Sequence, residues 1–571
     1  MKMKKKKKKF VPAIVAFLLI VIIGGAAAAK VLYDKYSYSK ERVDMDAFYQ
    51  VSGTESAIIL QDEMVDEKAV VKDGICYFDL DTVHKYMNEV FYVDLSENLL
   101  LYTSALETVR VNLGESTYTT ADGAKDLGCT IAYVENETVY VAADFVKLYT
   151  NYSYDIYDRH VQVYTQWGSK ETASVEKDTA VRERGGVKSP ILRDLAAGET
   201  VEILEEMETW SKVKTSDSVI GYVENKRLAN RITEQEIPVT DYAAPEYTSI
   251  SMPGKVSLGF HAIGGVGGNS TLDAMVAESK GMNVISPTWL SMIDNEGNIR
   301  SFGGRDYVQK AHDKGLQVWV AVDNFNYENE TGTAVDELAV LSSTTKRQKL
   351  VDNIMKEALT LGVDGINVDF EGLKEECGIH YVQFLRELSV RCRTNKMVLS
   401  VDNYVPFHFN DYYRLDIQGQ IVDYVIIMGY DEHWHGSKNP GSVASIDYVS
   451  NGLDKTLEEV PAEKVINAIP FYTIQWRTDG GNVTDEYLTL KNTPDFLQRV
   501  GMQKVWDETT CQNYIEWKEG SVTYQVWLED EESISVKLNV MSAKNIAGVA
   551  VWKLGDGTSG AWELLKIYTN S

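Results

Sequence analysis

One short stretch of the sequence combines polar side chains in a way that suits acid–base chemistry. Residues 364–371 read Asp-Gly-Ile-Asn-Val-Asp-Phe-Glu, so that Asn367, Asp369 and Glu371 alternate with apolar residues. Side chains alternate between the two faces of a strand, and these three therefore share one face. Two acids buried side by side hinder each other's ionisation unless they are paired, so the pattern predicts a raised pKa for one carboxyl.

A carboxyl group with a raised pKa stays protonated at neutral pH and can protonate a leaving group. Glu371 is the last of the three polar residues along the predicted strand, so we expect it nearest the mouth of the site and assign it the role of general acid. The alternative interpretation is an acidic strand end that pairs with an arginine of a neighbouring loop.

The segments around this stretch alternate between strand and helix patterns from residue 253 to residue 571. Helical patterns such as Lys346–Leu361 separate most of the strands, and eight strands with intervening helices predict an α/β fold, a (β/α)8 TIM barrel. An insertion is expected between strands seven and eight, at about residues 477–545. The predicted strands are Lys255–His261, Asn283–Pro287, Gln317–Val322, Gly365–Glu371, Met397–Val401, Tyr424–Met428, Val465–Pro470 and Gly548–Trp552.

The stretch resembles the strand-four motif of glycoside hydrolase family 18, Asp-x-x-Asp-x-Asp-x-Glu. Asp364, Asp369 and Glu371 match it, while Asn367 replaces the second Asp, as is usual in the branch of bacterial spore-cortex and peptidoglycan glucosaminidases. The resemblance covers about residues 253–571. Further stretches that resemble the family are Ile427-Met-Gly-Tyr-Asp-Glu-His433, Pro440-Gly-Ser-Val-Ala-Ser445, Pro470-Phe-Tyr472 and Trp552.

The resemblance implies retaining hydrolysis in which the substrate's own 2-acetamido oxygen is the nucleophile, with no cofactor and no metal. It implies that Glu371 protonates the leaving oxygen, that Asp369 orients the acetamido N–H and stabilises the oxazolinium cation, and that Tyr430 donates its hydroxyl to the acetamido group. Asn367 would hydrogen-bond Asp369 without taking up charge. The residues expected to bind substrate are Asp364, Asn367, Asp431, Tyr472 and Trp552, the last as a flat apolar floor for the sugar ring.

Other side chains near strand ends have more than one interpretation. His433 and His435 are spaced like metal ligands, although a loop that touches substrate is the interpretation we favour. Gly264-Gly-Val-Gly-Gly268 lacks the third glycine of a dinucleotide-binding loop. Four aromatic residues that follow strands could line a saccharide cleft, or belong to the core or the surface: Trp289, Trp434, Tyr472 and Trp476.

The N-terminus predicts attachment to a membrane. Residues 1–9 include seven lysines, and residues 10–29 form an uncharged run long enough to span the hydrocarbon core. The lysines favour a cytoplasmic tail and an exported body, with residues 10–29 as an uncleaved signal-anchor. The alternative is a secreted protein whose signal peptide is cleaved near Ala26–Ala29. Residues 30–50 are polar and predict a stalk.

Two small modules are expected between the stalk and the barrel. Residues 51–165 contain an imperfect repeat, in which Tyr77-Phe-Asp-Leu-Asp81 resembles Tyr140-Val-Ala-Ala-Asp144. This α+β pattern resembles the module named after the N-terminal domain of copper amine oxidases, a spacer or adhesion module in which His84 and His160 are the only histidines. Residues 173–230 predict a small β-barrel that resembles bacterial SH3-like domains, which often bind cell-wall peptides. Residues 231–252 predict a linker.

Composition narrows the possible partners. The net charge is −27 although the first nine residues are strongly basic, which argues against binding to nucleic acid. The five cysteines include no Cys-x-x-Cys pair, so neither a disulfide scaffold nor a thiolate zinc site is expected.

Together these features predict an exported, membrane-tethered hydrolase of glycan that contains β-linked N-acetylglucosamine, either peptidoglycan or a chitin-like polymer. The SH3-like domain would bind a cell-wall peptide or glycan. The alternative is a lectin-like barrel that binds such glycan without cutting it. Lectin-like relatives usually lose the strand-four Glu, so the presence of Glu371 favours the enzyme.

Overall fold

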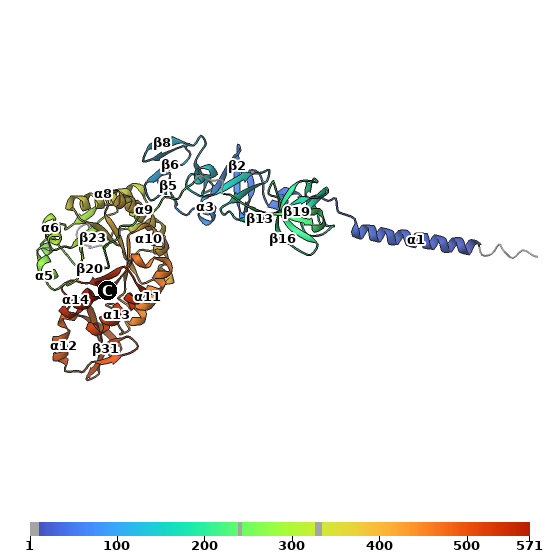
Figure 1. Ribbon diagram of the computed structural model, residues 1–571. Helices are drawn as coiled ribbons and strands as arrows, with labels where there is room; N and C mark the ends of the chain where they lie inside the picture. Colours follow the sequence, from blue (N-terminus) through green and yellow to red (C-terminus); the bar gives the residue numbers. More distant parts are fainter. Residues whose placement is uncertain (1–10, 238–241, 326–333, 571) are drawn as a thin grey trace, which may run out of the picture. The chain divides into compact units, whose positions relative to one another are not determined.

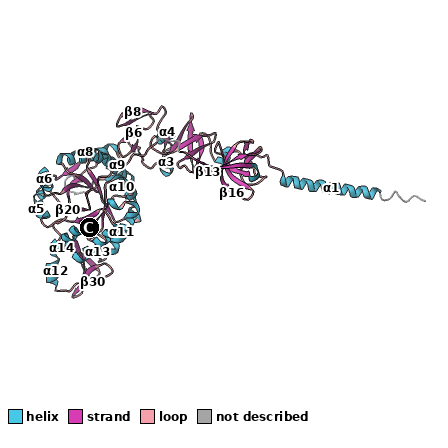
Figure 2. Cartoon of the chain, in the orientation of Figure 1, coloured by secondary structure: helices cyan, strands magenta, loops and turns pink. Residues whose placement is uncertain are grey.

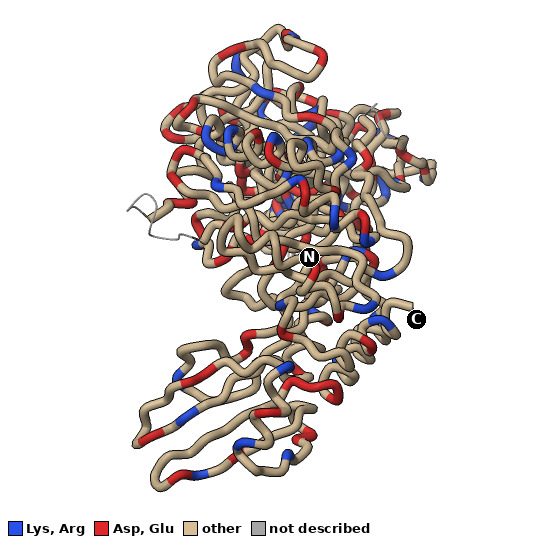
Figure 3. Tube along the Cα trace, turned by 90° about the vertical axis from the view of Figure 1, so that its left-hand side faces the viewer, with Lys and Arg blue, Asp and Glu red and all other residues tan. Residues whose placement is uncertain are grey.

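The computed structural model describes residues 11–237, 242–325 and 334–570 and divides them into two compact units. The first unit holds the residues up to 89, 113–117 and 126–244, and the second holds 90–112, 118–125 and 245 onward (Figure 1). The lysine-rich residues 1–9, Phe10 and residues 238–241 of the expected linker lie outside the described residues. Lys and Arg are interspersed with Asp and Glu along the described trace (Figure 3).

The second unit is built around a closed barrel of eight parallel strands, which confirms the predicted fold class. Strand β20 pairs with both β21 and β33 and so closes the sheet. The helices lie on the outside of the strands (Figure 2). The barrel strands are β20 (Val256–His261), β21 (Val284–Met292), β23 (Gln317–Asp323), β24 (Gly365–Asp369), β25 (Val398–Tyr404), β26 (Tyr424–Met428), β27 (Val465–Pro470) and β33 (Gly548–Trp552).

Each barrel strand is followed by at least one helix, as the alternating pattern predicts. The helices are α5 (Leu272–Val276), α6 (Arg305–Asp313), α7 (Glu337–Leu341), α8 (Thr344–Leu361), α9 (Gly378–Asn395), α10 (Leu415–Ile421), α11 (Ile446–Glu459), α13 (Glu531–Lys544) and α14 (Ser559–Thr569). Helix α8 ends at Gly362, whose φ of 76° lies in the left-handed region that glycine tolerates, and the chain turns there into β24.

A glycine at the start of β24 makes room for a large core side chain. A Cβ atom on Gly365 would lie 2.8 Å from Cδ1 of Trp319 and 3.0 Å from Cβ of Val398. The Trp319 side chain is fully buried and stacks on Tyr424 with ring centroids 5.3 Å apart. This packing fills the barrel with apolar side chains at the amino end of β24. The polar residues Asn367 and Asp369 lie further along the strand, towards its carboxyl end.

The expected insertion is present between β27 and β33. It forms a five-stranded antiparallel sheet in the order β29-β28-β32-β31-β30, and α12 (Thr493–Val500) packs on its apolar side chains. Its strands are β28 (Tyr472–Asp479), β29 (Asn482–Thr489), β30 (Val505–Asp507), β31 (Gln512–Glu519) and β32 (Val522–Leu528). A short strand, β22 (Ile299–Ser301), pairs with β21 outside the barrel.

A further sheet of the second unit comes from the region expected to be a single module, residues 51–165. Asp94 Oδ2 accepts the Thr344 N–H at 2.7 Å, at the start of α8, and Gln383 of α9 donates to Thr103 Oγ1 at 2.9 Å. The sheet therefore contacts α8 and α9, the helices that precede and follow β24 in the chain. Its strands are β4 (Phe91–Asp94), β5 (Leu99–Thr103), β6 (Thr108–Asn112), β7 (Thr117–Thr120) and β8 (Gly123–Asp126).

The rest of residues 51–165 forms a seven-stranded sheet in the first unit, in the order β11-β12-β1-β2-β3-β10-β9. In each copy of the repeat a strand is followed by a short helix, β3 by α3 and β10 by α4. The elements are β1 (Glu55–Leu60), β2 (Glu63–Lys72), β3 (Ile75–Asp79), α3 (Leu80–Tyr86), β9 (Ala132–Glu135), β10 (Thr138–Ala142), α4 (Ala143–Lys147), β11 (Ser153–Ile156) and β12 (His160–Tyr164).

The SH3-like sheet follows the order β15-β14-β18-β17-β16-β13-β19. Its strands are β13 (Ser169–Val175), β14 (Thr179–Arg182), β15 (Ile191–Leu195), β16 (Thr200–Glu206), β17 (Trp210–Thr215), β18 (Ile220–Glu224) and β19 (Leu228–Gln235). Part of the segment expected as a stalk, residues 30–50, belongs to this fold: Val43 N–H donates to Ile191 O at 3.0 Å, and α2 (Met45–Tyr49) buries Tyr49.

Helix α1 (Val11–Tyr36) is long and apolar enough to cross a membrane. Among the described residues it is the one helix that meets this condition, and its side chains are exposed. A signal sequence near an N-terminus passes the same test.

Candidate active site

A cavity of about 170 Å³ lies at the carboxyl end of the barrel strands. It is lined by side chains from or just after six different strands, which is where the chemistry of such barrels is found. The lining residues are Phe260, Phe325, Asp369, Glu371, Asp402, Tyr404, Met428, Tyr430, Asp431 and Trp552.

Glu371 lies two residues beyond the end of β24, where the predicted strand was expected to continue. Its backbone is held by Asn324, which accepts the Glu371 N–H at 2.9 Å and donates to the Glu371 carbonyl at 2.8 Å. Its carboxyl group is hydrogen-bonded by the Tyr404 hydroxyl, which also accepts the Gly372 N–H at 3.1 Å. Asn324, which follows β23, and Tyr404, the last residue of β25, therefore fix the position of Glu371.

The electrostatic environment favours the protonated form of Glu371. Burial raises the pKa of Glu371 above its ordinary value, the hydrogen bond from Tyr404 works against that shift, and the nearby Asp431 carboxyl adds to it. A carboxyl group with a raised pKa beside a buried cavity has the properties that a general acid needs.

Asp369 is the last residue of β24 and lines the cavity, with 8% of its surface exposed. Burial raises its pKa well above the ordinary value, and the carboxyl groups of Asp402, Glu371 and Asp323 add to that shift. Asp323, at the end of β23, has a pKa raised by burial to about 6. The sequence pattern predicts a raised pKa for one acid of the pair, whereas the structure raises the pKa of both.

Asn367 is buried below these acids and was expected to hydrogen-bond Asp369. The structure corrects this partner: Asn367 Nδ2 donates to Asp402 Oδ2 at 2.5 Å, and Asn367 Oδ1 accepts from Ser400 Oγ at 2.6 Å. Both partners belong to β25, which pairs with β24. Asn367 therefore acts on a carboxyl that the strand-four pattern does not contain.

Tyr430 and Asp431 follow the end of β26. The Tyr430 side chain is 9% exposed and lines the cavity. Asp431 has a φ of 60°, a backbone conformation that Asp adopts more readily than most residues. Burial raises the pKa of the Asp431 carboxyl, and the Tyr472 hydroxyl, which donates to Asp431 Oδ1, acts in the opposite direction.

Two of the residues expected to bind substrate have other contacts. Tyr472 does not line the cavity; it orients Asp431 from β28. Asp364 precedes β24 at the opposite end of the barrel, about 23 Å of extended strand from Glu371. Its carboxylate accepts from His312 Nε2 and from the Val318 N–H, each at 2.8 Å. The expectation for Asp364 is therefore corrected, because it ties β23 to β24 on the far side from the cavity.

Some of the aromatic residues line the cavity, and others lie in the core or on the surface. Trp552, at the end of β33, lines the cavity with its ring centroid 5.6 Å from that of Phe260. Trp289 and Trp476 are fully buried, so they belong to the core rather than to a cleft. Trp434 is 57% exposed.

The two histidines considered as metal ligands have separate partners. His433 Nδ1 lies 3.0 Å from the Asn439 carbonyl oxygen, and His435 pairs with Asp485. Within the described ranges, no group of three or more His, Cys, Asp and Glu side chains is arranged to hold a metal ion.

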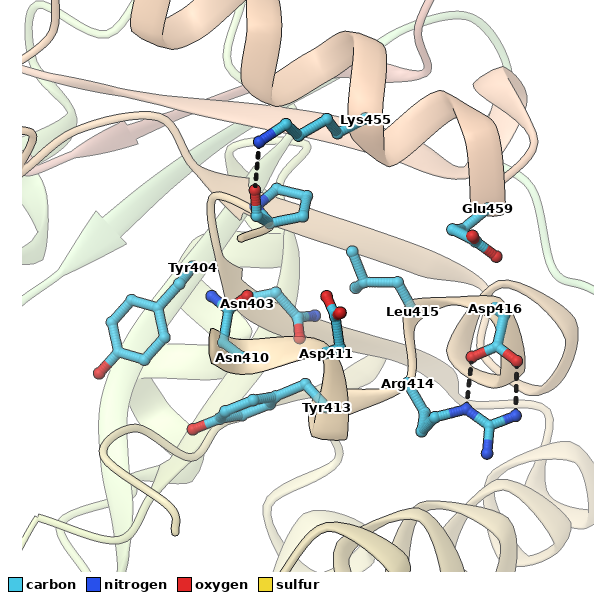
Figure 4. Close-up of a pocket in the computed structure, with 11 residues that line it drawn as sticks. Asn403, Tyr404, Asn410, Asp411, Tyr413, Arg414, Leu415, Asp416, Lys455 and Glu459 are labelled. Carbon is cyan, nitrogen blue, oxygen red and sulfur yellow. Dashed lines mark hydrogen bonds and ion pairs between the residues drawn. The ribbon is translucent and has the colours of Figure 1, made fainter. Parts of the chain in front are cut away.

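A larger cavity, of about 320 Å³, lies beside the site between α10 and α11. Arg414 and Asp416 form a two-bond ion pair there, and Lys455 donates to the Pro406 carbonyl at 3.4 Å (Figure 4). This cavity shares Tyr404 with the smaller one but contains neither Asp369 nor Glu371. The grouping of carboxyls, rather than the volume, therefore identifies the candidate active site.

Comparison with sequence families gives two matches. Residues 281–557 match the family described as glycosyl hydrolases family 18, and residues 177–229 match bacterial SH3 domains. The first match spans β21 to β33 and so contains almost the whole barrel.

Individual relatives cover parts of the chain. It is 27% identical over 248 residues to the cortical fragment-lytic enzyme of Bacillus anthracis, a match that covers 42% of this chain and 57% of that protein. It is 25% identical over 304 residues to the uncharacterized glycosylase YvbX of Bacillus subtilis strain 168, which covers 50% of this chain and 84% of that protein. The spore cortex-lytic enzyme SleL of Bacillus cereus shares the fold, with a TM-score of 0.50 and 19% identity over 69% of this chain and 98% of that one.

Proposed function

The chain contains a domain of glycosyl hydrolases family 18, and from this premise we propose that it is an exported, membrane-tethered glycosidase that cleaves glycan with β-linked N-acetylglucosamine. The observation that carries the proposal is the state of Glu371: a carboxyl with a raised pKa, held by Asn324 and Tyr404 at the edge of the cavity and close to Asp369.

In the proposed reaction, the 2-acetamido oxygen of the substrate attacks the anomeric carbon and Glu371 protonates the departing glycosidic oxygen. Asp369 accepts the acetamido N–H and stabilises the positive charge of the oxazolinium intermediate in a cavity where water screens little. Tyr430 lines the same cavity and donates its hydroxyl to the acetamido group. Water then opens the oxazolinium, with Glu371 now acting as the base, so that the anomeric configuration is retained.

Peptidoglycan is the polymer that we propose as substrate. The relative from Bacillus anthracis is named for lysis of cortical fragments, and the barrel is preceded here by a bacterial SH3 domain. We propose that this domain holds the enzyme on a cell-wall peptide or glycan, and that α1 remains in the membrane with the body outside. A chitin-like polymer is the competing substrate.

The experiment is a hydrolysis assay with the full chain in detergent, given purified peptidoglycan and chitin separately. We expect new N-acetylglucosamine reducing ends from peptidoglycan, and a turnover about 10²–10⁴-fold lower for Glu371→Gln. Glu375→Gln is the matched control, because Glu375 is an exposed acid four residues further along the chain. A Glu371→Gln variant that keeps more than half of the wild-type rate would exclude Glu371 as the acid.

The same assay separates the enzyme from a lectin-like barrel. A chain that sediments with peptidoglycan but releases no reducing ends from either polymer is a binding protein, and the proposed function is then wrong.

A further inference from the structure

Asp402 is a buried carboxyl beside Asp369 that the proposed mechanism does not use. Val368 pairs with Val401 across β24 and β25, so Asp369 and Asp402 are the next residues along the two strands. Both side chains line the cavity, and 8% of Asp369 and 3% of Asp402 is exposed. The two carboxyl groups are therefore neighbours inside the barrel, with little access to water.

The hydrogen bonds around the pair are incomplete. Asn367 donates to Asp402 Oδ2 at 2.5 Å, and Ser400 fixes the Asn367 amide by donating to its oxygen. Oδ1 of Asp369 and Oδ1 of Asp402 are both buried and have no hydrogen-bond partner among the described residues. Two adjacent carboxylate oxygens that accept from no donor are costly to bury.

The surrounding elements offer the pair no compensating positive charge within the described ranges. No Lys, Arg or His there forms an ion pair with Asp369 or Asp402, and Arg300 acts on Asp323 instead. The titratable groups that face the pair are acids or tyrosines, and burial raises the pKa of each of these tyrosines, so they are neutral at neutral pH: Asp323, Glu371, Tyr381, Tyr413 and Tyr430.

We propose that Asp369 and Asp402 hold one proton between them, and that Asp402 is the positioning residue that sets the charge of Asp369. Two like charges this close in a buried site do not both ionise. A single proton gives the pair one donor and one acceptor, which removes both the repulsion and the unpaired oxygens. In agreement with this, burial raises the pKa of both groups well above the ordinary value, the Asp402 carboxyl adds to the shift of Asp369, and the Glu371 carboxyl adds to the shift of Asp402.

The role of the shared proton rests on the proposed function. At rest the N–H of Asn367 favours the negative charge on Asp402, so the proton lies on Asp369. When a substrate acetamido N–H arrives, the proton passes from Asp369 to Asp402, and Asp369 becomes the anion that the oxazolinium needs. The pair carries one negative charge before and after this transfer, so no proton is exchanged with solvent.

The test counts protons and requires no catalysis. The full chain is unfolded in weakly buffered guanidinium with detergent at neutral pH, where every unfolded Asp and Glu is ionised, and the released protons are measured with an indicator dye. We expect Asp369→Asn and Asp402→Asn each to release one proton fewer than wild type, because the remaining carboxyl ionises once its repelling neighbour has become an amide donor. The double variant should also release one fewer.

The swap Asn367→Asp with Asp402→Asn is the matched control. It keeps the hydrogen bond between positions 367 and 402 with donor and acceptor exchanged, and it returns one carboxyl to the side of Asp369. We expect it to restore the wild-type proton count.

Three results would overturn the proposal. Unchanged proton counts in both single variants would mean that the pair holds no proton. A deficit of two protons in the double variant would mean that the two carboxyls are protonated independently. A swap variant that stays one proton short of wild type would mean that Asp402 acts in another way. Far-ultraviolet circular dichroism first confirms that each variant is folded. If Asp402→Asn does not fold, the proton count of Asp369→Asn alone tests the proposal. Since these counts involve no glycan, they fail or succeed separately from the hydrolysis assay.

Discussion

Replacing Tyr404 with Phe should move the alkaline limb of the rate profile to higher pH. The Tyr404 hydroxyl hydrogen-bonds the Glu371 carboxyl, and this bond lowers the pKa of Glu371 against the effect of burial. Without the hydroxyl, the pKa of Glu371 rises. A general acid works only while protonated, so activity is lost as pH rises through that pKa, and the loss should come at higher pH in the variant.

The size of the shift follows from the strength of one hydrogen bond. A hydrogen bond to a charged group contributes about 1.5–3 kcal/mol, and one pKa unit corresponds to about 1.36 kcal/mol. Tyr404 is 36% exposed, so water replaces part of the lost bond. We therefore expect a shift of about one pH unit in the alkaline limb of kcat, measured with a soluble oligosaccharide substrate.

Tyr413→Phe is the matched control. The Tyr413 hydroxyl accepts the Leu373 N–H and donates to the Phe370 carbonyl, each at 3.2 Å, so it supports the same loop without touching the Glu371 carboxyl. We expect its alkaline limb to stay where it is in wild type. A Tyr404→Phe limb that is unmoved, or that moves to lower pH, would refute the electrostatic role given to Tyr404.

Further variants test the remaining parts of the account. Asp364→Ala should lower stability by about 1–3 kcal/mol, because it leaves the Val318 N–H without its acceptor, and should leave kcat unchanged; urea unfolding and the hydrolysis assay measure these effects. Arg347 of α8 forms a buried ion pair with Glu387 of α9 at 2.9 Å, and Arg347→Ala should lower stability by about 3–5 kcal/mol because Glu387 loses its counter-charge, which urea unfolding also measures. Protease added to intact cells should digest the barrel and leave residues 10–29 in the membrane, whereas a mature protein that begins near Ala29 would show a cleaved signal.

The positions of the barrel strands were predictable because the barrel has a strong pattern. Three of the eight strands, β26, β27 and β33, have the predicted bounds, and each is a mainly apolar run. The alternation of Asn367, Asp369 and Glu371 also indicated which side chains enter the barrel. Glu371 lies beyond the end of its strand, because Asn324 rather than a neighbouring strand holds its backbone.

Three residues around the carboxyls were missed: Asn324, Asp402 and Tyr404. A signal for two of them was present, since Asp402 and Tyr404 are two positions apart, as Asp369 and Glu371 are, and side chains two positions apart on a strand share a face. The predicted strand ended at Val401, so these side chains were not placed in the barrel. Asn324 follows β23 and its contact with Glu371 joins two loops, for which a sequence period gives no indication.

The motif misled at Asp364 for a geometric reason. A strand rises about 3.3 Å per residue, so a residue seven positions before Glu371 stands at the other end of the barrel. The split of residues 51–165 was also hidden, because the sheet at 90–125 pairs with α8 and α9, which lie some 250 residues later. Only a tertiary contact of this kind shows that the sheet belongs to the catalytic unit.

The central claim is that the substrate's acetamido group, and not a second carboxyl, is the nucleophile. The most direct measurement compares kcat for two oligosaccharides that differ only in the sugar ring bound next to Glu371, which carries either a 2-acetamido or a 2-hydroxyl group. With the acetamido group the account predicts turnover and a product of retained anomeric configuration, and with the hydroxyl group it predicts binding but a kcat lower by at least about 10³-fold. Equal turnover of the two substrates, or a sugar ester trapped on Asp369, would contradict it.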